Sequence, residues 1–283
     1  MTSIPKDGVL SSSSERLAEP TIGSAMKLKG FSRFFIAKSI HQNALTDNPS
    51  LIQIRHGLYG IKRQPTITPF RLTLENTDCL TFIPRRDNTI LARTQTTSQG
   101  NSRRYLMVLF NPLQTEFQRK ALSRIFHRTP LIRLRPGIVL LPQIRTRRVR
   151  LYSPSLLRPS EFISRLLELG AEVLYAPRLE LVHSSGDRII VEVIQSNLTN
   201  RAQRIVKACR SLFMRLSTVQ KENGQTKQFS NQFRRLRSQM RLFRKQVQFF
   251  HNEFGIDLSN LVNRVASAIT RVHHRLNLCD ASK

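Results

Sequence analysis

The sequence predicts an α+β fold in three successive parts, and three observations support this prediction. Short apolar runs separated by Gly, Pro and Asn fill the first two thirds of the chain, which is typical of strands joined by turns. Apolar residues recur every three or four positions through the last third, which predicts packed helices. Hydrophobic residues make up 40% of the 283, so buried cores can form. After a disordered leader at 1–25, the expected parts are a small α+β module at 26–97, a second domain at 103–195 and a helical region at 196–278.

The first module is predicted to begin with a helix. Phenylalanine and lysine side chains recur at helical spacing between residues 26 and 45, and Pro49 ends that segment. Two alternating runs then flank the pair His56-Gly57, which predicts a β-hairpin. A helix followed by a basic hairpin is the layout of a winged-helix DNA-binding module. Its candidate nucleic-acid contacts are Arg33, Lys38 and Arg55. Further short strands are expected at 71–74, 80–83 and 89–92.

The second domain alternates strand-like and helix-like segments. Strands are expected at 105–110, 131–134, 137–141, 148–152, 173–175 and 188–194. Helices are expected at 115–126 and 160–170, the second with Ser160 as its N-cap and Gly170 at its end. The order strand, helix, strands, helix, strands is that of a ferredoxin-like unit.

The last third carries two sustained apolar seams. The first is Leu198, Ala202, Ile205, Cys209, Leu212, Leu216 and Val219, and the second is Phe229, Phe233, Leu236, Met240, Phe243, Val247, Phe250 and Phe254. Joined by a polar turn at 221–227, they predict an antiparallel helical hairpin with coiled-coil-like packing. A third helix is expected after Gly255, capped by Asp257 or by Ser259.

Charge points to the class of partner. The formal net charge is +28, and 35 of the 46 basic residues are arginine. Arginine presents a planar, always-charged fork that pairs with phosphate and with guanine edges. We therefore expect a nucleic-acid partner, in preference to an anionic membrane or an acidic protein.

Two clusters of cations have few acidic neighbours in sequence. The first, expected on strands of the second domain, is Arg133, Arg135, Arg145, Arg147, Arg148 and Arg150. The second lies on the helical hairpin, with Arg201, Arg204, Lys207, Arg210 and Arg215 on one arm and Arg234, Arg235, Arg237, Arg241, Arg244 and Lys245 on the other. Glu222 is the only acid between Asn197 and Glu253. A phosphate-binding surface is the functional interpretation of both clusters, and a solvated face is the alternative.

The sequence predicts no catalytic centre. It contains no Walker loop, no H-E-x-x-H, no G-x-S-x-G and no dinucleotide-binding glycine motif. Its seven histidines are scattered, and its three cysteines form no C-x-x-C pair. No apolar run approaches the roughly 20 residues of a membrane-spanning helix. We therefore expect a cytoplasmic protein without a metal or cofactor and without a membrane partner.

Four segments carry a resemblance to known proteins: 105–110, the arginine-rich turn into 137–142, 162–172, and Gln248-Phe249-Phe250. Through them, about residues 103–275 resemble the N-terminal region of bacterial chromate-resistance regulators and, more loosely, repressors of the phenylacetate-degradation type. This resemblance implies a transcriptional regulator. The second domain is also similar to the small CRISPR-adaptation nucleases, which carry an Asp at the end of the first strand. Asn111 stands at that place, which argues against metal-dependent nuclease activity.

The leading hypothesis is a DNA-binding transcriptional regulator, expected to be a homodimer, in which arginines hold phosphates. An RNA-binding protein is the first alternative, since strongly basic proteins also bind structured RNA. The others are a protein whose basic hairpin lies on an anionic membrane and a metal-dependent nuclease of the CRISPR-adaptation type.

Overall fold

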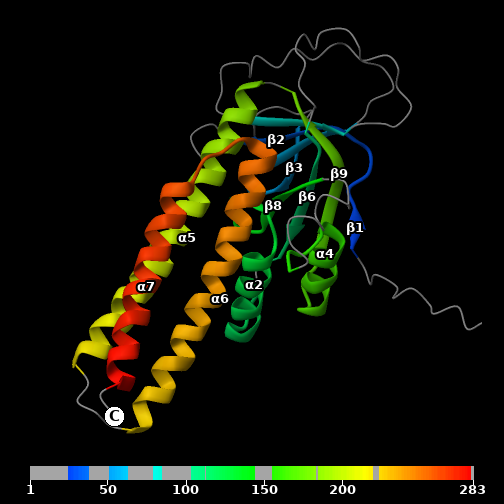
Figure 1. Ribbon diagram of the computed structural model, residues 1–283. Helices are drawn as coiled ribbons and strands as arrows, with labels where there is room; N and C mark the ends of the chain where they lie inside the picture. Colours follow the sequence, from blue (N-terminus) through cyan, green and yellow to red (C-terminus); the bar gives the residue numbers. More distant parts are fainter. Residues whose placement is uncertain are drawn as a thin grey trace, which may run out of the picture.

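The described strands of the protein belong to one sheet, and the long helices extend from that sheet as an arm (Figure 1). The structure is a computed structural model. It describes residues 25–37, 51–62, 79–84, 103–111, 113–143, 155–182, 184–218 and 223–281. Over these residues the fold is α+β, as the sequence predicts, with a mostly antiparallel sheet.

Five short strands form the N-terminal part of the sheet. They are β1 (Met26–Lys27), β2 (Phe31–Ala37), β3 (Leu51–Arg55), β4 (Leu58–Lys62) and β5 (Cys79–Pro84). The predicted hairpin is confirmed, since β3 and β4 pair antiparallel across a turn in which Gly57 has a φ of 77°. The strand expected at 80–83 is confirmed as β5, and those expected at 71–74 and 89–92 lie outside the described residues.

The helix predicted between residues 26 and 45 is wrong where the structure describes the chain, because β2 occupies that place. Alternate side chains of β2 face opposite sides of the sheet: Phe34 enters the main core, while Phe35 packs beside Tyr59. Closely spaced aromatic residues are compatible with the spacing of a helix and with that of a strand. Hydrogen bonding of this segment to β4 and β5 favours the strand. The helix that a winged-helix module would need is therefore not present in the described part of residues 26–45. Lys38, a predicted nucleic-acid contact, lies outside the described residues.

The next six elements follow the order strand, helix, strand, strand, helix, strand. They are β6 (Tyr105–Phe110), α2 (Glu116–Arg128), β7 (Ile132–Arg135), β8 (Ile138–Pro142), α4 (Pro159–Glu168) and β9 (Val173–Leu181). The four strands lie in the order β9-β6-β8-β7 and are antiparallel throughout. Both predicted helices are confirmed, and the strand expected at 148–152 lies outside the described residues.

Local hydrogen bonds cap the N-termini of α2 and α4, and the N-cap of α4 differs from the expected residue. Thr115 caps α2 in a reciprocal pair with Gln118, with bonds of 3.2 and 3.1 Å. The N-cap of α4 is Arg158 and not Ser160, and the Glu161 side chain accepts a 2.8 Å bond from the backbone N–H of Arg158. The helix begins earlier than expected because Pro159 suits the first helical position.

The strand expected at 188–194 is also wrong, since helix α5 (Ser184–Thr218) runs through it. The β-branched residues of this stretch favour a strand locally. However, Ile190, Ile194 and Leu198 are buried four residues apart and continue the helical seam up to the sheet. Tertiary burial of one helical face therefore outweighs the local preference.

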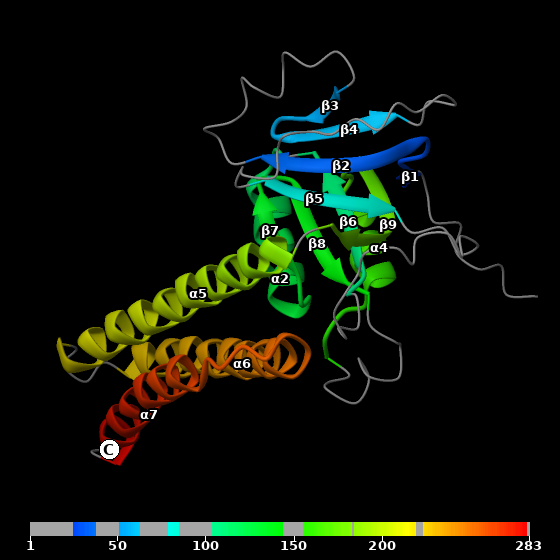
Figure 2. The same ribbon diagram turned by 90° about the horizontal axis from the view of Figure 1, so that it is seen from above.

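The sheet is covered on both faces. Leu106, Val108 and Phe110 of β6 face α2 and α4, while alternate residues of the same strand face α5 in the main core. The pairing of β5 with β9 joins the strands of the first two predicted parts into one sheet. Figure 2 shows β2, β4 and β5 running across the view while β8 runs down it, so the sheet is strongly twisted.

The arm is a bundle of α5, α6 (Asn223–Phe254) and α7 (Ser259–Ala281). Most members of the seams predicted from the 3- and 4-residue spacing are buried, with Phe243 and Val265 fully enclosed, while Met240 is partly buried and Val219 lies outside the described residues. Helix α6 begins inside the stretch 221–227 that was expected to be the turn. Asp257 accepts a 2.9 Å bond from the N–H of Ser259 ahead of α7. None of the helices in the described ranges is long and apolar enough to cross a membrane.

Candidate nucleic-acid interface

A row of four exposed arginines runs along α6, and we call it the arginine stripe. Its members are Arg234, Arg237, Arg241 and Arg244. Their spacings of 3, 4 and 3 place them on one face of the helix. Each follows a residue of the apolar seam by one position, so the stripe borders the packed core of the arm. Arg235 is also exposed but lies on another face, the one that carries Gln239 and Gln246.

Helix α5 holds α6 through arginine–glutamine pairs. Nη1 of Arg201 donates to Oε1 of Gln246, and Nη2 of Arg215 donates to Oε1 of Gln232 over 2.8 Å. Paired helices ordinarily use Glu at such flanking positions, which neutralises the basic partner. Glutamine accepts the hydrogen bond but leaves the positive charge in place. The arm is therefore held together without losing its charge.

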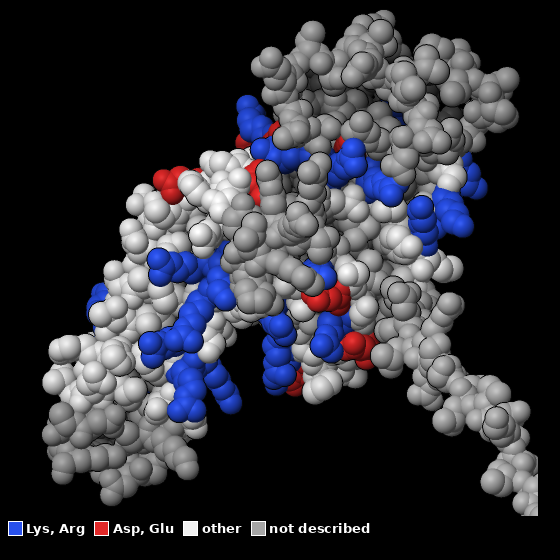
Figure 3. Space-filling view, turned by 45° about the vertical axis from the view of Figure 1, so that its right-hand side comes forward, with Lys and Arg blue, Asp and Glu red and all other residues white. Residues whose placement is uncertain are grey.

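Acidic side chains lie on the sheet, on α2 and α4, and at the sheet end of the arm, and not along the middle of α5 and α6 in the described residues. Ion pairs between described residues include Arg103 with Asp187, Arg104 with Glu180, Lys120 with Glu116, Arg165 with Glu168 and Arg188 with Glu192. All of them lie on the sheet, on α2 and α4, or at the start of α5. Over the described residues 193–218 and 223–252 there is no Asp or Glu. Figure 3 accordingly shows a group of blue side chains part of the way down the arm with no red among them, while red side chains are visible at the upper end of the arm.

The arginines of the sheet that were predicted to contact nucleic acid differ in their exposure to solvent. Arg133 is exposed on β7, with its guanidinium carbon 5.0 Å from the centre of the Phe126 ring. Arg33 and Arg135 are half-buried. The remaining candidates of this group, Arg145, Arg147, Arg148 and Arg150, lie outside the described residues. Of the first cluster, Arg133 is therefore the described member that faces solvent.

Arg55 is turned toward the protein and not toward solvent. It donates through Nη1 to the carbonyls of Phe110 and Gly137, and through Nη2 to Oδ1 of Asn111. Burial lowers the pKa of Arg55, and the charge of Glu172 opposes that shift. In this position Arg55 fastens the β3–β4 turn to the β7–β8 turn.

A cavity of about 370 Å³ lies where α2, β7, α5 and α6 meet, and we call it the α2–α6 cavity. Arg133, Arg201 and Arg204 line it, together with His127 and no acidic residue. Burial lowers the pKa of Arg201 to about 10. Burial, and then the charges of Arg201 and Arg204, lower the pKa of His127 to about 4. Sequence reasoning missed His127 because its neighbours in the cavity are distant in the chain.

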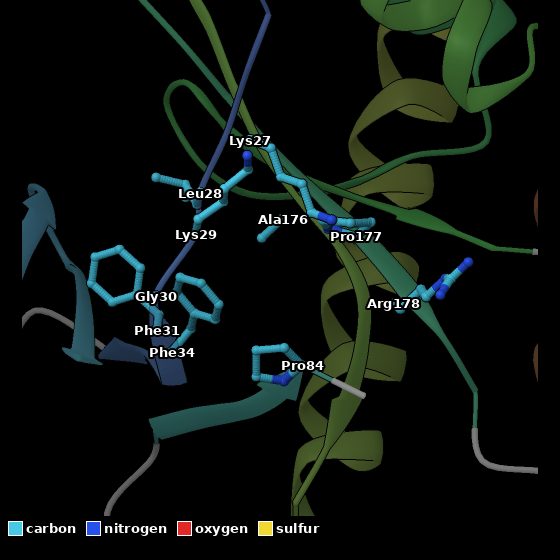
Figure 4. A pocket seen from close by; sticks show the side chains of 10 residues that line it. All are labelled: Lys27, Leu28, Lys29, Gly30, Phe31, Phe34, Pro84, Ala176, Pro177 and Arg178. Atoms are coloured by element: carbon cyan, nitrogen blue, oxygen red, sulfur yellow. The ribbon is translucent and has the colours of Figure 1, made fainter. Parts of the chain in front are cut away.

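A second cavity, of about 430 Å³, lies between the N-terminal strands and β9. Figure 4 shows Phe31, Phe34 and Pro84 around it and the Arg178 side chain pointing away from it. Arg178 has a φ of 57° at an irregular point of the β6–β9 pairing, and its N–H donates to Oε1 of Gln143 over 3.1 Å. The walls are largely apolar, and nothing in this cavity indicates a catalytic group.

Groups that could support catalysis are not gathered in the described part of the chain. No set of three or more His, Cys, Asp or Glu side chains is placed there to hold a metal ion. Burial raises the pKa values of Cys79 and Cys209 to about 11, so both thiols stay protonated near neutral pH. Asn111, at the end of β6, donates to Glu172 and accepts from Arg55.

Comparison of the chain with known protein families, with curated proteins and with solved structures finds no match.

Proposed function

We propose that the protein binds nucleic acid, duplex DNA in the first place, through the cationic arm, and that it acts as a transcriptional regulator and not as an enzyme. The observation that carries the proposal is the arginine stripe on a helix that has no carboxylate over residues 223–252. Like charges held this close repel one another at low salt. A polyanion that lies along the arm relieves this repulsion.

The spacing of the stripe suits a phosphate backbone. At a rise of about 1.5 Å per residue, Arg234 and Arg244 are separated by about 15 Å along the helix. One strand of duplex DNA carries a phosphate about every 3.4 Å along its axis. A duplex lying parallel to the helix passes about four phosphate steps per strand over that length, and its strands wind past the stripe. Such contacts bind and orient the nucleic acid, while sequence is read through base edges.

The order β6-α2-β7-β8-α4-β9, with strands arranged β9-β6-β8-β7, supports the assignment of this part as a ferredoxin-like unit. In the proposal this unit is the rigid body from which the arm extends. Homodimerisation remains part of the proposal. The regulator role also draws on the resemblance of residues 103–275 to chromate-resistance and phenylacetate-type regulators.

The test compares binding of the full chain to labelled duplex DNA and to duplex and single-stranded RNA of the same sequence. Changing all four stripe residues, Arg→Gln, is expected to weaken DNA binding at least about a hundredfold at low salt. The matched control is Lys27→Gln, Lys29→Gln, Lys62→Gln and Arg119→Gln, which removes the same charge from exposed positions on the sheet and α2. The control is expected to bind within about threefold of the unchanged protein.

Equal losses in the two variants would show that net charge alone governs binding and would overturn the role of the stripe. Tighter binding of RNA than of DNA would favour the RNA-binding alternative. Selection of bound fragments from random duplex DNA tests the regulator role separately. A shared motif supports a regulator, whereas uniform recovery contradicts it.

A further inference from the structure

The α2–α6 cavity holds three arginines from separate elements. Arg133 comes from β7, and Arg201 and Arg204 come from α5. Its lining includes no Asp or Glu, so nothing in the cavity wall neutralises these cations. Proximity to Arg204 adds to burial in lowering the pKa of Arg133. Like charges held close together, with only Arg201 of the three partly buried, favour an accompanying counterion.

One guanidinium nitrogen of Arg201, beside the cavity wall, has an unused hydrogen-bonding capacity. Nη1 of Arg201 donates to Gln246, but Nη2 is buried and has no hydrogen-bond partner among the described residues. Leaving a charged donor buried without an acceptor is costly, and native structures rarely do so without a functional reason. Nη2 has almost no accessible surface although the cavity is open, so the charges that a ligand in the cavity can reach are chiefly those of the exposed Arg133 and Arg204.

The rest of the wall suits the body of a small ligand. Asn197, Asn200 and Gln239 supply amide groups that donate or accept hydrogen bonds. Phe126 and Phe250 supply apolar surface at the same cavity. The volume of about 370 Å³ lies within the range of ordinary small-molecule sites.

We propose that the α2–α6 cavity is a binding site for a small phosphate-bearing molecule, whose oxyanion is held by Arg133, Arg201 and Arg204. Guanidinium groups match the geometry of phosphate oxygens better than any other side chain. The site is separate from the arginine stripe, which lies on a different face of α6. It also connects α2 to the arm, so an occupied site stabilises the position of the arm against the sheet.

The test titrates the full chain with inorganic phosphate, with a nucleoside 5′-monophosphate and with a short DNA oligonucleotide, by calorimetry and by NMR of the His127 ring. A bound phosphate is expected to raise the pKa of His127 from its lowered value, because an anion stabilises the protonated imidazole. Arg204→Gln and Arg133→Gln, both at exposed positions, are each expected to weaken phosphate binding about tenfold. The control is Arg210→Gln, an exposed arginine of α5 outside the cavity, which should leave binding unchanged.

Failure of the phosphate and the monophosphate to bind or to shift His127 would overturn the proposal. Equal binding by Arg204→Gln and Arg210→Gln would overturn it as well. A His127 shift caused by the oligonucleotide alone would assign the cavity to the nucleic-acid interface and not to a small ligand. The stripe variant separates the two proposals, because it is expected to lose DNA binding and to keep the phosphate response.

Discussion

Gln246 connects Arg201 to the C-terminal end of helix α2. Its Oε1 accepts from Nη1 of Arg201, and its Nε2 lies 3.1, 3.3 and 2.7 Å from the carbonyls of Phe126, His127 and Thr129. An amide is the side chain that can serve both neighbours, since a carboxylate cannot donate to carbonyls and a lysine cannot accept from arginine. This one residue therefore holds α5, α6 and α2 together.

Gln246→Leu is expected to lower the free energy of unfolding by about 2 kcal/mol, because it leaves buried carbonyls and an arginine N–H without partners. The measurement is urea unfolding followed by circular dichroism. Gln248→Leu changes an exposed glutamine two residues along the same helix and should alter stability by less than about 0.5 kcal/mol. Equal effects in the two variants would remove Gln246 as the link between the arm and α2.

Gly137→Ala is expected to destabilise the protein by about 2 kcal/mol or more. A Cβ at Gly137 would lie 2.6 Å from the carbonyl oxygen of Phe110 and 2.8 Å from Nη1 of Arg55, and its φ is 74°. Gly30 is the matched control, with a φ of 82° and no neighbour within 4 Å of the added carbon. Gly30→Ala should therefore cost only the backbone strain of about 1 kcal/mol. Thermal unfolding of both variants measures the difference, and similar melting temperatures would contradict the close fit of Arg55.

His127 is expected to make stability fall as the solution is acidified. Its pKa is about 4 in the folded protein and about 6.5 in the unfolded chain, so the unfolded state binds the extra proton first. Its contribution is complete above pH 6.5 and is lost as the pH falls through 4, with a total of at most about 3 kcal/mol. Urea unfolding at several pH values between 7 and 4 measures the free energy of unfolding at each pH. This free energy should change less with pH in His127→Gln than in the unchanged protein.

The arginine stripe is expected to set much of the salt dependence of DNA binding. Each phosphate contact contributes about 0.9 to the slope of log affinity against log salt, so the four-residue variant should lose about 3.6. Fluorescence anisotropy over a series of salt concentrations measures this slope. A variant that binds more weakly but keeps the original slope would show that the stripe acts through folding and not through phosphate contacts.

Several features of the protein follow from the sequence alone. The apolar spacing of 3 and 4 residues predicts the three helices of the arm, because a seam of that period is buried only when a helix packs along it. The continuous apolar runs at 105–110 and 137–141 predict β6 and β8, because a strand that is buried on both faces of a sheet has apolar residues at successive positions. The excess of arginine over acid is a property of composition, and folding redistributes this charge without removing it.

The tertiary structure decided two kinds of feature. One is the secondary structure of segments whose local sequence suits a helix and a strand, and the other is contacts between residues that are far apart in the sequence. Phe34 suits a helix and a strand equally, and pairing with β4 and β5 selects the strand. Ile190 favours a strand locally, but burial of one face makes its segment part of α5. Whether an arginine meets solvent also depends on residues far away in sequence: Arg55 is satisfied by carbonyls at Phe110 and Gly137, while Arg201 meets Gln246 and the α2–α6 cavity. Spacing along a chain specifies the face on which a side chain lies, and only packing specifies what that face meets.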